Sequence, residues 1–155
     1  MIDEAFRTSR RYAAAQTAIL CAFTTVLLFD RAPFLFESSA ARIAGGILSA
    51  AGLLLMFAAL VSLRRAVQIA PEPRADAELV TSGVYARFRH PIYTAIVAIV
   101  AGLFLRQPTM AVAAASGAVI IFLARKVRFE EMRLAARYPA YPAYKRRTWG
   151  LFPPM

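Results

Sequence analysis

The chain has 155 residues, of which 59% are hydrophobic, and a formal net charge of +10 at pH 7. This composition is more apolar than that of soluble proteins and its apolar residues come in blocks, so we expect one integral membrane domain, residues 1–155. The basic residues flank the apolar blocks, which favours anionic lipid head groups over nucleic acid as their partners. Because Cys21 is the only cysteine and His90 the only histidine, an intrachain disulfide and a Cys/His metal site are excluded, and we expect Cys21 to be a buried thiol.

Two uncharged runs predict the first two membrane spans, residues 13–29 and residues 43–63. A signal peptide cleaved near residues 38–40 is the alternative for the first run, but its length favours an uncleaved helix. Small residues in the second run predict a face that packs closely on another helix, with simple tolerance of glycine in a membrane helix as the alternative. These small residues are Gly45, Gly46, Ser49, Ala50 and Gly52.

A long polar segment follows, in which Pro71 and Pro73 interrupt any helix and residues 81–83 predict a turn. Two further apolar runs, residues 91–105 and 109–124, are separated by three residues and so predict an antiparallel helical hairpin. No helix breaker follows the second run before Pro139, which indicates one long helix from Thr109 to about Arg137 that leaves the membrane. The expected fold is therefore an all-α bundle of about four transmembrane helices with a cytoplasmic C-terminal helical extension.

The distribution of basic residues predicts the orientation of this bundle. The N-terminus, the middle polar segment and the C-terminus hold 16 of the 19 Lys and Arg residues. The positive-inside rule then places both termini in the cytoplasm, and we expect the protein to span the inner membrane. The polar segment that ends at His90 and the pair Glu130-Glu131 fall on that same side, at the ends of adjoining helices.

Two blocks of sequence resemble an enzyme family. Residues 83–93, GVYARFRHPIY, resemble the Gly-x-Tyr-x-x-x-Arg-His-Pro-x-Tyr signature of integral membrane methyltransferases, a group that includes isoprenylcysteine carboxyl methyltransferases and phospholipid N-methyltransferases. The second block is a Glu-Glu pair followed by a leucine, two spaced tyrosines and a proline: Glu130, Glu131, Leu134, Tyr141, Tyr144 and Pro153. The resemblance covers residues 78–153. It departs from the family at Ala95, where glycine is frequent, and at residues 138–140 before the tail tyrosines.

The resemblance implies S-adenosylmethionine as methyl donor, bound without a Rossmann domain, and the sequence has no Gly-x-Gly-x-x-Gly motif after a strand pattern. A glutamate would hold the donor's ammonium, Arg89 and His90 its carboxylate, and tyrosine rings its cationic sulfur. The residues expected to be catalytic are His90, Arg89 and Glu130. Those expected to bind the cofactor are Tyr85, Arg89, His90, Tyr93, Glu130, Glu131 and Tyr141, and no metal is expected.

Each of these residues also has a local interpretation. His90 before a proline is a candidate helix cap, and Arg87 and Arg89 are candidates for lipid phosphates. Helical spacing pairs Glu130 with Lys126 or Arg133, and Glu131 with Arg128. The aromatic tail, residues 138–149, is typical of an interface anchor. Because consecutive helical residues point about 100° apart, both glutamates do not face one ligand equally, and we favour Glu130 for the site.

The function that these patterns favour is methyl transfer to a lipophilic acceptor that enters from the bilayer, most like isoprenylcysteine carboxyl O-methylation. Phospholipid amine N-methylation and phenolic-lipid O-methylation are the alternatives within the same enzyme class. A carboxylate acceptor needs no base, whereas an amine or phenol needs one, for which His90 or a tyrosinate is the nearby candidate. A non-enzymatic membrane scaffold or lipid-binding protein is the alternative of another class.

Overall fold

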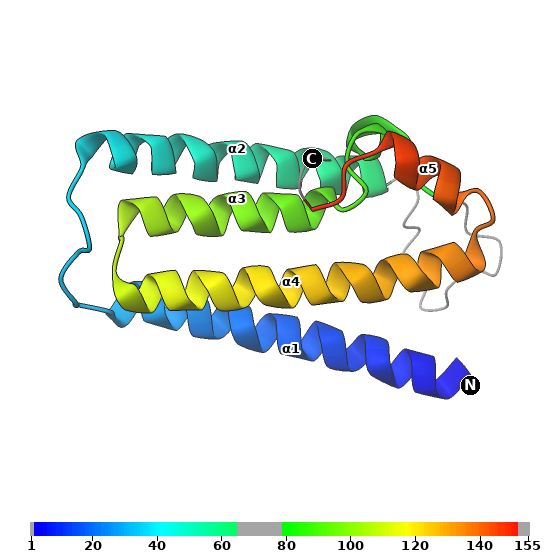
Figure 1. The fold of residues 1–155 in the computed structure, drawn as a ribbon, viewed down its shortest axis with the longest axis horizontal. Helices are drawn as coiled ribbons and strands as arrows, with labels where there is room; N and C mark the ends of the chain where they lie inside the picture. The colour runs from blue at the N-terminus through cyan, green and yellow to red at the C-terminus, as the bar shows by residue number, and fades with distance from the viewer. Residues whose placement is uncertain (1, 65–78, 152–155) are drawn as a thin grey trace.

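The computed structural model describes residues 2–64 and 79–151, so the predictions made for Pro71, Pro73 and Pro153 lie outside the described residues. Within them the chain is all-α, as predicted (Figure 1). The elements in chain order are α1 (Ile2–Phe29), α2 (Ser39–Arg64), the 3₁₀ turn η1 (Gly83–Ala86), α3 (Pro91–Arg106), α4 (Met110–Arg137) and α5 (Tyr141–Arg147).

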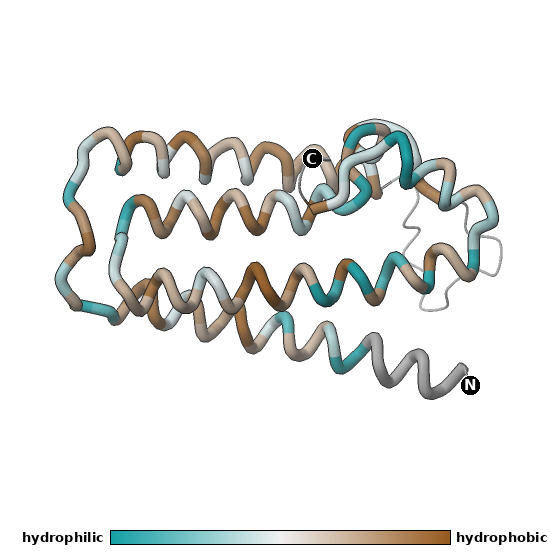
Figure 2. The backbone as a smooth tube through the Cα atoms, viewed as in Figure 1, coloured by the Kyte–Doolittle hydropathy of each residue, from teal (hydrophilic) through white to brown (hydrophobic). Residues whose placement is uncertain are grey.

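Three of the described helices are long and apolar enough to cross a membrane: α1 over Arg10–Phe29, α2 over Ser39–Leu63, and α4. The third predicted span, residues 91–105, corresponds to α3, which has 16 residues and at about 1.5 Å per residue is shorter than a hydrocarbon core of about 30 Å. The middle parts of the helices are mostly hydrophobic (Figure 2), and large apolar side chains such as Leu54 and Phe57 are about 70% exposed. Apolar side chains on the outside and polar groups at the ends fit a bundle surrounded by lipid.

Small residues of α2, among them Gly45, Ser49 and Gly52, pack on α3 as predicted, whereas Ala50 is exposed. A Cβ atom added at Gly52 would lie 2.9 Å from the carbonyl oxygen of Ala95, and one added at Gly45 would collide with the carbonyl oxygen of Gly102. Ser49 joins this face by donating a hydrogen bond of 3.4 Å to a backbone carbonyl of α3. The absence of side-chain volume lets the two backbones approach closely, which stabilises helix pairs in lipid by van der Waals contact.

The second pair, α1 and α4, packs through larger side chains. Phe23 of α1 is buried with Val119 and Leu123 of α4, and Tyr12 stacks on Phe129 with ring centroids 4.7 Å apart. The prediction of a buried Cys21 is wrong, because this thiol is exposed on the outside of α1. An apolar run does not specify which of its faces meets protein, since lipid tails are as apolar as a protein core.

The turn between α3 and α4 is held to the end of α1. Thr109 caps α4 by accepting a hydrogen bond from the backbone N–H of Val112, and its hydroxyl donates to the carboxylate of Asp30. The side chain of Gln107 donates to the backbone carbonyl of Asp30 at 3.4 Å. The predicted hairpin and the predicted long helix from this cap to Arg137 are confirmed.

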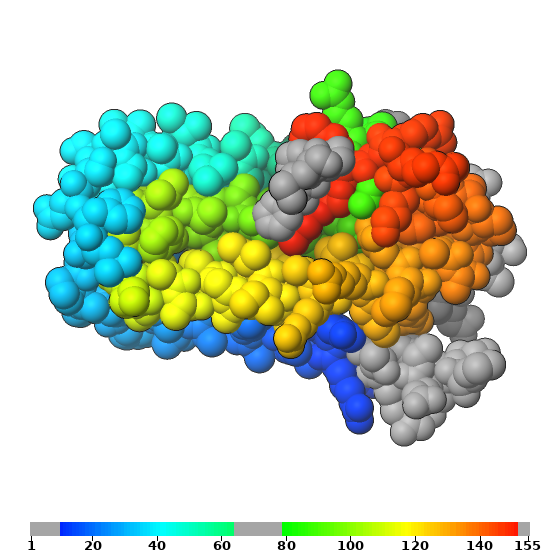
Figure 3. Space-filling model, in the orientation of Figure 1, coloured from blue at the N-terminus to red at the C-terminus, as the bar shows by residue number. Residues whose placement is uncertain are grey.

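The two helices of this hairpin differ in length, and this difference creates space at the other end of the bundle. α4 has 28 residues and α3 has 16, so α4 continues well beyond the start of α3. Figure 3 shows α5 above the end of α4, and η1 packs against α2 at the same end of the molecule. The polar signature residues and the tail thereby meet at one end of the molecule.

Candidate functional site

A cavity of about 480 Å³ lies where α4 extends past α3, and we call it the cap cavity. Five elements and the segment before η1 contribute side chains to its wall. The lining residues are Gln16, Leu79, Val80, Tyr85, Arg89, His90, Pro91, Ile92, Tyr93, Lys126, Glu130, Leu134, Tyr138, Tyr141 and Tyr144. The wall is thus aromatic and apolar, with two basic residues, one histidine and one carboxylate placed in it.

The signature segment is shaped by a glycine and fastened to the C-terminal tail. Gly83 has φ of +61°, a left-handed conformation that favours glycine, and a Cβ there would lie 2.5 Å from Ser62 Oγ. The backbone N–H of Arg89 donates to the carbonyl of Trp149, and the N–H of Trp149 donates to the carbonyl of Arg87, both at 2.7 Å. These bonds bring residues sixty positions apart into register at the edge of the cap cavity.

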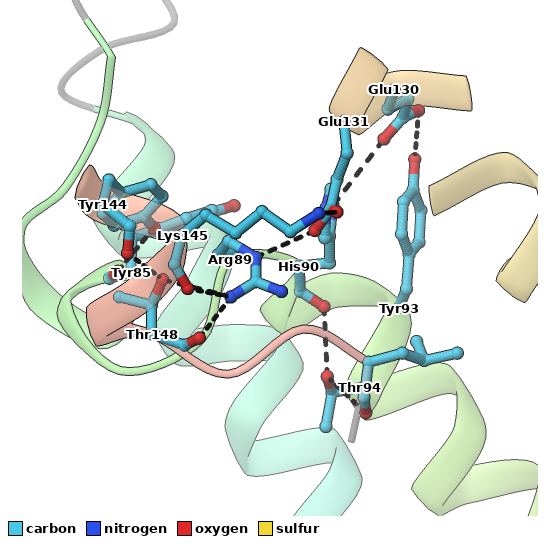
Figure 4. A network of polar contacts seen from close by, with 11 residues as sticks. Tyr85, Arg89, His90, Tyr93, Thr94, Glu130, Glu131, Tyr144, Lys145 and Thr148 are labelled. Atoms are coloured by element: carbon cyan, nitrogen blue, oxygen red, sulfur yellow. Dashed lines mark hydrogen bonds and ion pairs between the residues drawn. The ribbon is translucent and has the colours of Figure 1, made fainter. Parts of the chain in front are cut away.

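Arg89 joins α4, α5 and the tail. Its Nε donates to Glu131 Oε1 at 2.8 Å, and its Nη1 donates to the carbonyl oxygens of Lys145, at 2.8 Å, and Thr148. Its side chain is only 11% exposed. Because these charge-assisted bonds fix the position of the guanidinium, Arg89 organises the wall of the cavity as well as lining it (Figure 4).

Glu131 lies behind the wall rather than in it. Its two carboxylate oxygens accept from Arg89 at 2.8 Å and from Lys145 Nζ at 2.6 Å. Its ion-pair partners come from the signature and from α5, and not from Arg128, the neighbour that helical spacing suggested. Two cations therefore neutralise this carboxylate, whereas Glu130 faces the cap cavity.

His90 lies between the two glutamates with unused hydrogen-bonding capacity. Its Nδ1 is 3.8 Å from Glu130 Oε2 and its Nε2 is 3.6 Å from Glu131 Oε1, and its ring stacks on Tyr93 with centroids 5.7 Å apart. The residue is 7% exposed, and Nε2 has no hydrogen-bond partner among the described residues. His90 occupies the N-cap position of α3 but makes no side-chain capping bond there. The local interpretation of His90 as a helix cap therefore has no supporting bond in this geometry.

A second polar cluster lies on the face of α4 that lines the cavity. Tyr93 donates its hydroxyl to Glu130 Oε1 at 2.8 Å, and Lys126 Nζ lies 3.8 Å from the same oxygen. Lys126 also donates to Gln16 Oε1 of α1 at 2.5 Å and lies 5.0 Å from the centroid of the Tyr93 ring. From sequence, Lys126 was predicted only as a helical partner of Glu130, and Gln16 was not predicted to be a site residue. The four-residue spacing of Lys126, Glu130 and Leu134, which places them on one helical face, is the signal that identifies Lys126.

Three tyrosines form the side of the cavity nearest α5. Tyr144 donates its hydroxyl to the backbone carbonyl of Tyr85 at 2.6 Å, while the buried hydroxyl of Tyr141 has no hydrogen-bond partner among the described residues. Burial raises the pKa of Tyr85, and burial together with the nearby Tyr85 raises the pKa of Tyr144 to about 12 against an opposing effect of Arg89. Burial and the charge of Glu131 also raise the pKa of Tyr141. These phenols are therefore protonated at neutral pH, which disfavours a tyrosinate as general base.

The cap cavity brings together six of the seven residues that the sequence analysis assigned to a cofactor, and Glu131 supports the wall from behind. The tail residues Tyr138, Tyr141 and Tyr144 line the cavity, so at these positions the tail is more than an interface anchor. Cofactor binding by these residues remains a prediction. Clusters of three or more potential metal ligands are not found among the described residues.

Comparison with known proteins identifies the family. The sequence profile of the phospholipid methyltransferase family matches residues 40–140, more than half of the chain. The cobalt-zinc-cadmium resistance protein CzcN of Cupriavidus metallidurans is 35% identical over 81 residues, which cover 52% of this chain and 38% of that protein. The chain thus spans well under two thirds of the length of that curated relative, and no solved structure matches it significantly. The matched region contains the signature and the Glu-Glu pair, and with its apolar helices the chain is an integral membrane protein that belongs to the phospholipid methyltransferase family.

Proposed function

We propose that this protein transfers a methyl group from S-adenosylmethionine to a lipophilic acceptor. The observation that supports this most strongly is the position of His90 and Glu130 in the cap cavity, side by side and at the end of an apolar bundle. A buried polar group without a partner is rare in proteins and indicates a site for a ligand or water. His90 Nε2 and the Tyr141 hydroxyl are two such groups at this one cavity.

The lining of the cap cavity suits the chemical parts of this donor. Its volume of about 480 Å³ falls within the range of about 300–1,000 Å³ that is usual for small-molecule sites. Glu130 would bind the ammonium of the donor, while His90 and the part of Arg89 that faces the cavity would bind its carboxylate. The rings of Tyr85 and Tyr93 offer faces for adenine and for a cationic sulfur.

Bound there, the donor supplies an electrophilic methyl group on a cationic sulfur. The protein's contribution is to hold donor and acceptor in line and to exclude water, since positioning alone accounts for a large part of catalysis in such displacements. Arg89 and Glu131 would fix the wall against which the donor lies, and Tyr93 would orient the carboxylate of Glu130 through its hydroxyl. His90 and Glu130 are the residues we expect to contact the donor close to the reacting atoms.

The acceptor would enter from the bilayer and meet the cap cavity at the cytoplasmic surface, with both termini on that side. Isoprenylcysteine-like carboxylates, phospholipid amines and phenolic lipids are the acceptor classes to be compared. The basic residues of α5 and the exposed Trp149 would rest among anionic lipid head groups. This topology follows from the positive-inside distribution of Lys and Arg.

Donor binding is the direct test of the proposed function. Isothermal titration of the purified protein in detergent with S-adenosylmethionine should give a saturable signal, and His90→Ala and Glu130→Gln should each weaken binding at least about tenfold, as expected for loss of a charged or buried hydrogen bond. Glu37→Gln, an exposed site at the far end of the bundle, is the matched control and should bind like the parent.

Two results would oppose the proposal. Absence of donor binding by the parent protein would favour a non-enzymatic scaffold, and unchanged binding in both variants would place the donor elsewhere.

Incubation of membrane lipids with donor labelled in its methyl group then distinguishes the acceptors, because label in phospholipid indicates amine methylation and label in another lipophilic product indicates a carboxylate or phenol.

A further inference from the structure

Lys126 is a largely buried cation whose hydrogen-bond partner is neutral. Its side chain is 13% exposed, and its ammonium donates to the amide oxygen of Gln16 at 2.5 Å. It also forms an ion pair with Glu130 Oε1, which is 3.8 Å away, beyond hydrogen-bond distance, and which already accepts a hydrogen bond from Tyr93. Because a buried lysine is usually paired closely with an anion, this long and shared ion pair leaves capacity for a negatively charged ligand.

The charges around the cap cavity lead to the same conclusion. Arg89 is paired with Glu131, which lies behind the wall. Glu130 already accepts a hydrogen bond from Tyr93, and it is the only described carboxylate in the lining. When the ammonium of the methyl donor occupies Glu130, Lys126 has no other carboxylate among the described lining residues to balance it. An anion beside Lys126 would restore neutrality in a site of low dielectric constant.

The position of Lys126 fits the acceptor better than the donor. It lies four residues before Glu130 on α4, one turn closer to the apolar part of that helix that begins at Met110. Its partner Gln16 belongs to α1, so this side of the cavity is formed where α1 meets α4. A lipid that enters the cavity from the hydrocarbon of the bilayer would bring its polar end to the depth of Lys126 before it reached Glu130.

We propose that Lys126, held in place by Gln16, binds the anionic end of the acceptor and selects a lipid that ends in a carboxylate over one that ends in an amine. This inference rests on the proposed function. In the reaction the carboxylate oxygen attacks the methyl carbon, the carbon–sulfur bond breaks with its electron pair on sulfur, and a neutral methyl ester forms. No proton has to be removed, and the loss of negative charge ends the attraction to Lys126, which favours release of the ester.

The test compares three probes that share one farnesyl thioether chain and end in a carboxylate, its methyl ester or a primary amine. Each probe is titrated into the full-length protein in lipid nanodiscs, first alone and then with the demethylated donor, so that no turnover occurs. The parent should bind the carboxylate at least about tenfold more tightly than the ester or the amine, as expected for a close buried charge pair. Lys126→Gln should abolish this preference, Lys126→Arg should retain it, and Arg125→Gln, an exposed neighbour, is the matched control.

The outcomes separate this inference from the proposed function. A parent that prefers the amine or shows no preference, or a Lys126→Gln variant that keeps the preference for the carboxylate, overturns the role of Lys126. Binding of S-adenosylmethionine by the parent is measured on the same samples, and thermal unfolding, a readout independent of the cavity, shows that Lys126→Gln and Lys126→Arg are folded. If the parent fails to bind donor, the proposed function is wrong, while the probe preference still decides whether Lys126 forms an anion site.

Discussion

The two ends of the bundle use polar side chains in different ways. At the turn end, Asp30, Gln107 and Thr109 bond to one another and to the backbone, and the hollow near them measures only about 60 Å³. At the cap end there is a cavity of about 480 Å³, and the two buried side-chain atoms without partners in the described part of the chain, on His90 and Tyr141, both lie there. The turn end is complete as a structure, whereas the cap end retains hydrogen-bonding capacity for a ligand.

This difference distinguishes residues whose hydrogen bonds stabilise the fold from residues whose polar atoms are free to bind a ligand. Arg89, though adjacent to His90 in sequence, holds the fold because several carbonyl and carboxylate oxygens accept its hydrogen bonds, in addition to the contact with the donor that we propose for its cavity-facing part. His90 and Tyr141 belong to the second kind. Substitutions at Arg89, Thr109 and Tyr141 should therefore affect stability and ligand binding to different degrees. The expected loss of stability is largest at Arg89 and smallest at Tyr141.

Removal of Arg89 should have the largest effect, because its guanidinium connects three segments of the cap. Arg89→Ala should lower the free energy of unfolding by about 3 kcal/mol, the usual result of breaking a buried ion pair from one side. It should also loosen α5, so that trypsin cleaves at Lys145–Arg147 faster than in the parent. Thermal unfolding in detergent and timed proteolysis measure the two effects, and Arg87→Ala, exposed and two residues earlier, is the control. Equal stability of the Arg89 and Arg87 variants would contradict the role of Arg89 as a structural clamp.

At the turn end, Thr109→Val should destabilise the protein without affecting ligand binding. The substitution removes the cap of α4 and the donor to Asp30, and losses of this kind cost about 1–2 kcal/mol. Thr24→Val is the matched control, because among the described residues its exposed hydroxyl donates to the carbonyl of Leu20 in its own helix. Thermal unfolding and donor titration are measured on both variants. A clear loss of donor affinity in Thr109→Val would show that the turn end and the cap end are coupled.

The smallest effect on stability is expected at Tyr141. Tyr141→Phe removes a hydroxyl that has no partner among the described residues, so unfolding should change by less than about 0.5 kcal/mol. If a ligand uses this hydroxyl, donor affinity should fall roughly three- to tenfold, the usual worth of one hydrogen bond. Tyr144→Phe provides the contrast, because its hydroxyl is bonded to the carbonyl of Tyr85 and its loss should lower stability. If Tyr141→Phe binds the donor with the affinity of the parent, the Tyr141 hydroxyl does not contact the donor.

Much of the fold was predictable because membrane helices are specified by local sequence. Apolar runs, the proline at the start of α3, the threonine before α4 and the small residues of α2 each act through neighbours in the chain or through backbone sterics, and the described helices agree with them. The resemblance of residues 83–93 and of Glu130-Glu131 to a methyltransferase family likewise needed only motifs in the right order, and the family match confirms it.

The failures concern the choice of partners. The sequence placed Cys21 inside, although it faces outward, and it suggested Arg128 for Glu131, whose cations are Arg89 and Lys145. Helical spacing describes only which residues are neighbours along one helix. Which face of a helix meets protein rather than lipid depends on the packing of all the helices together, and an apolar surface is acceptable in both environments.

The sequence by itself determined the helical class, the approximate helix limits and the family, because each of these follows from local composition and short motifs. Only the tertiary structure decided that α4 extends beyond α3 and that η1 and α5 line the space beyond the start of α3. It also decided that Gln16 and Lys126 lie in the same cavity wall as the signature residues. These contacts join residues as far as 110 positions apart. No pattern in the chain encodes such a meeting directly, since it depends on how far each helix extends from a shared turn and on what then fills the space beyond.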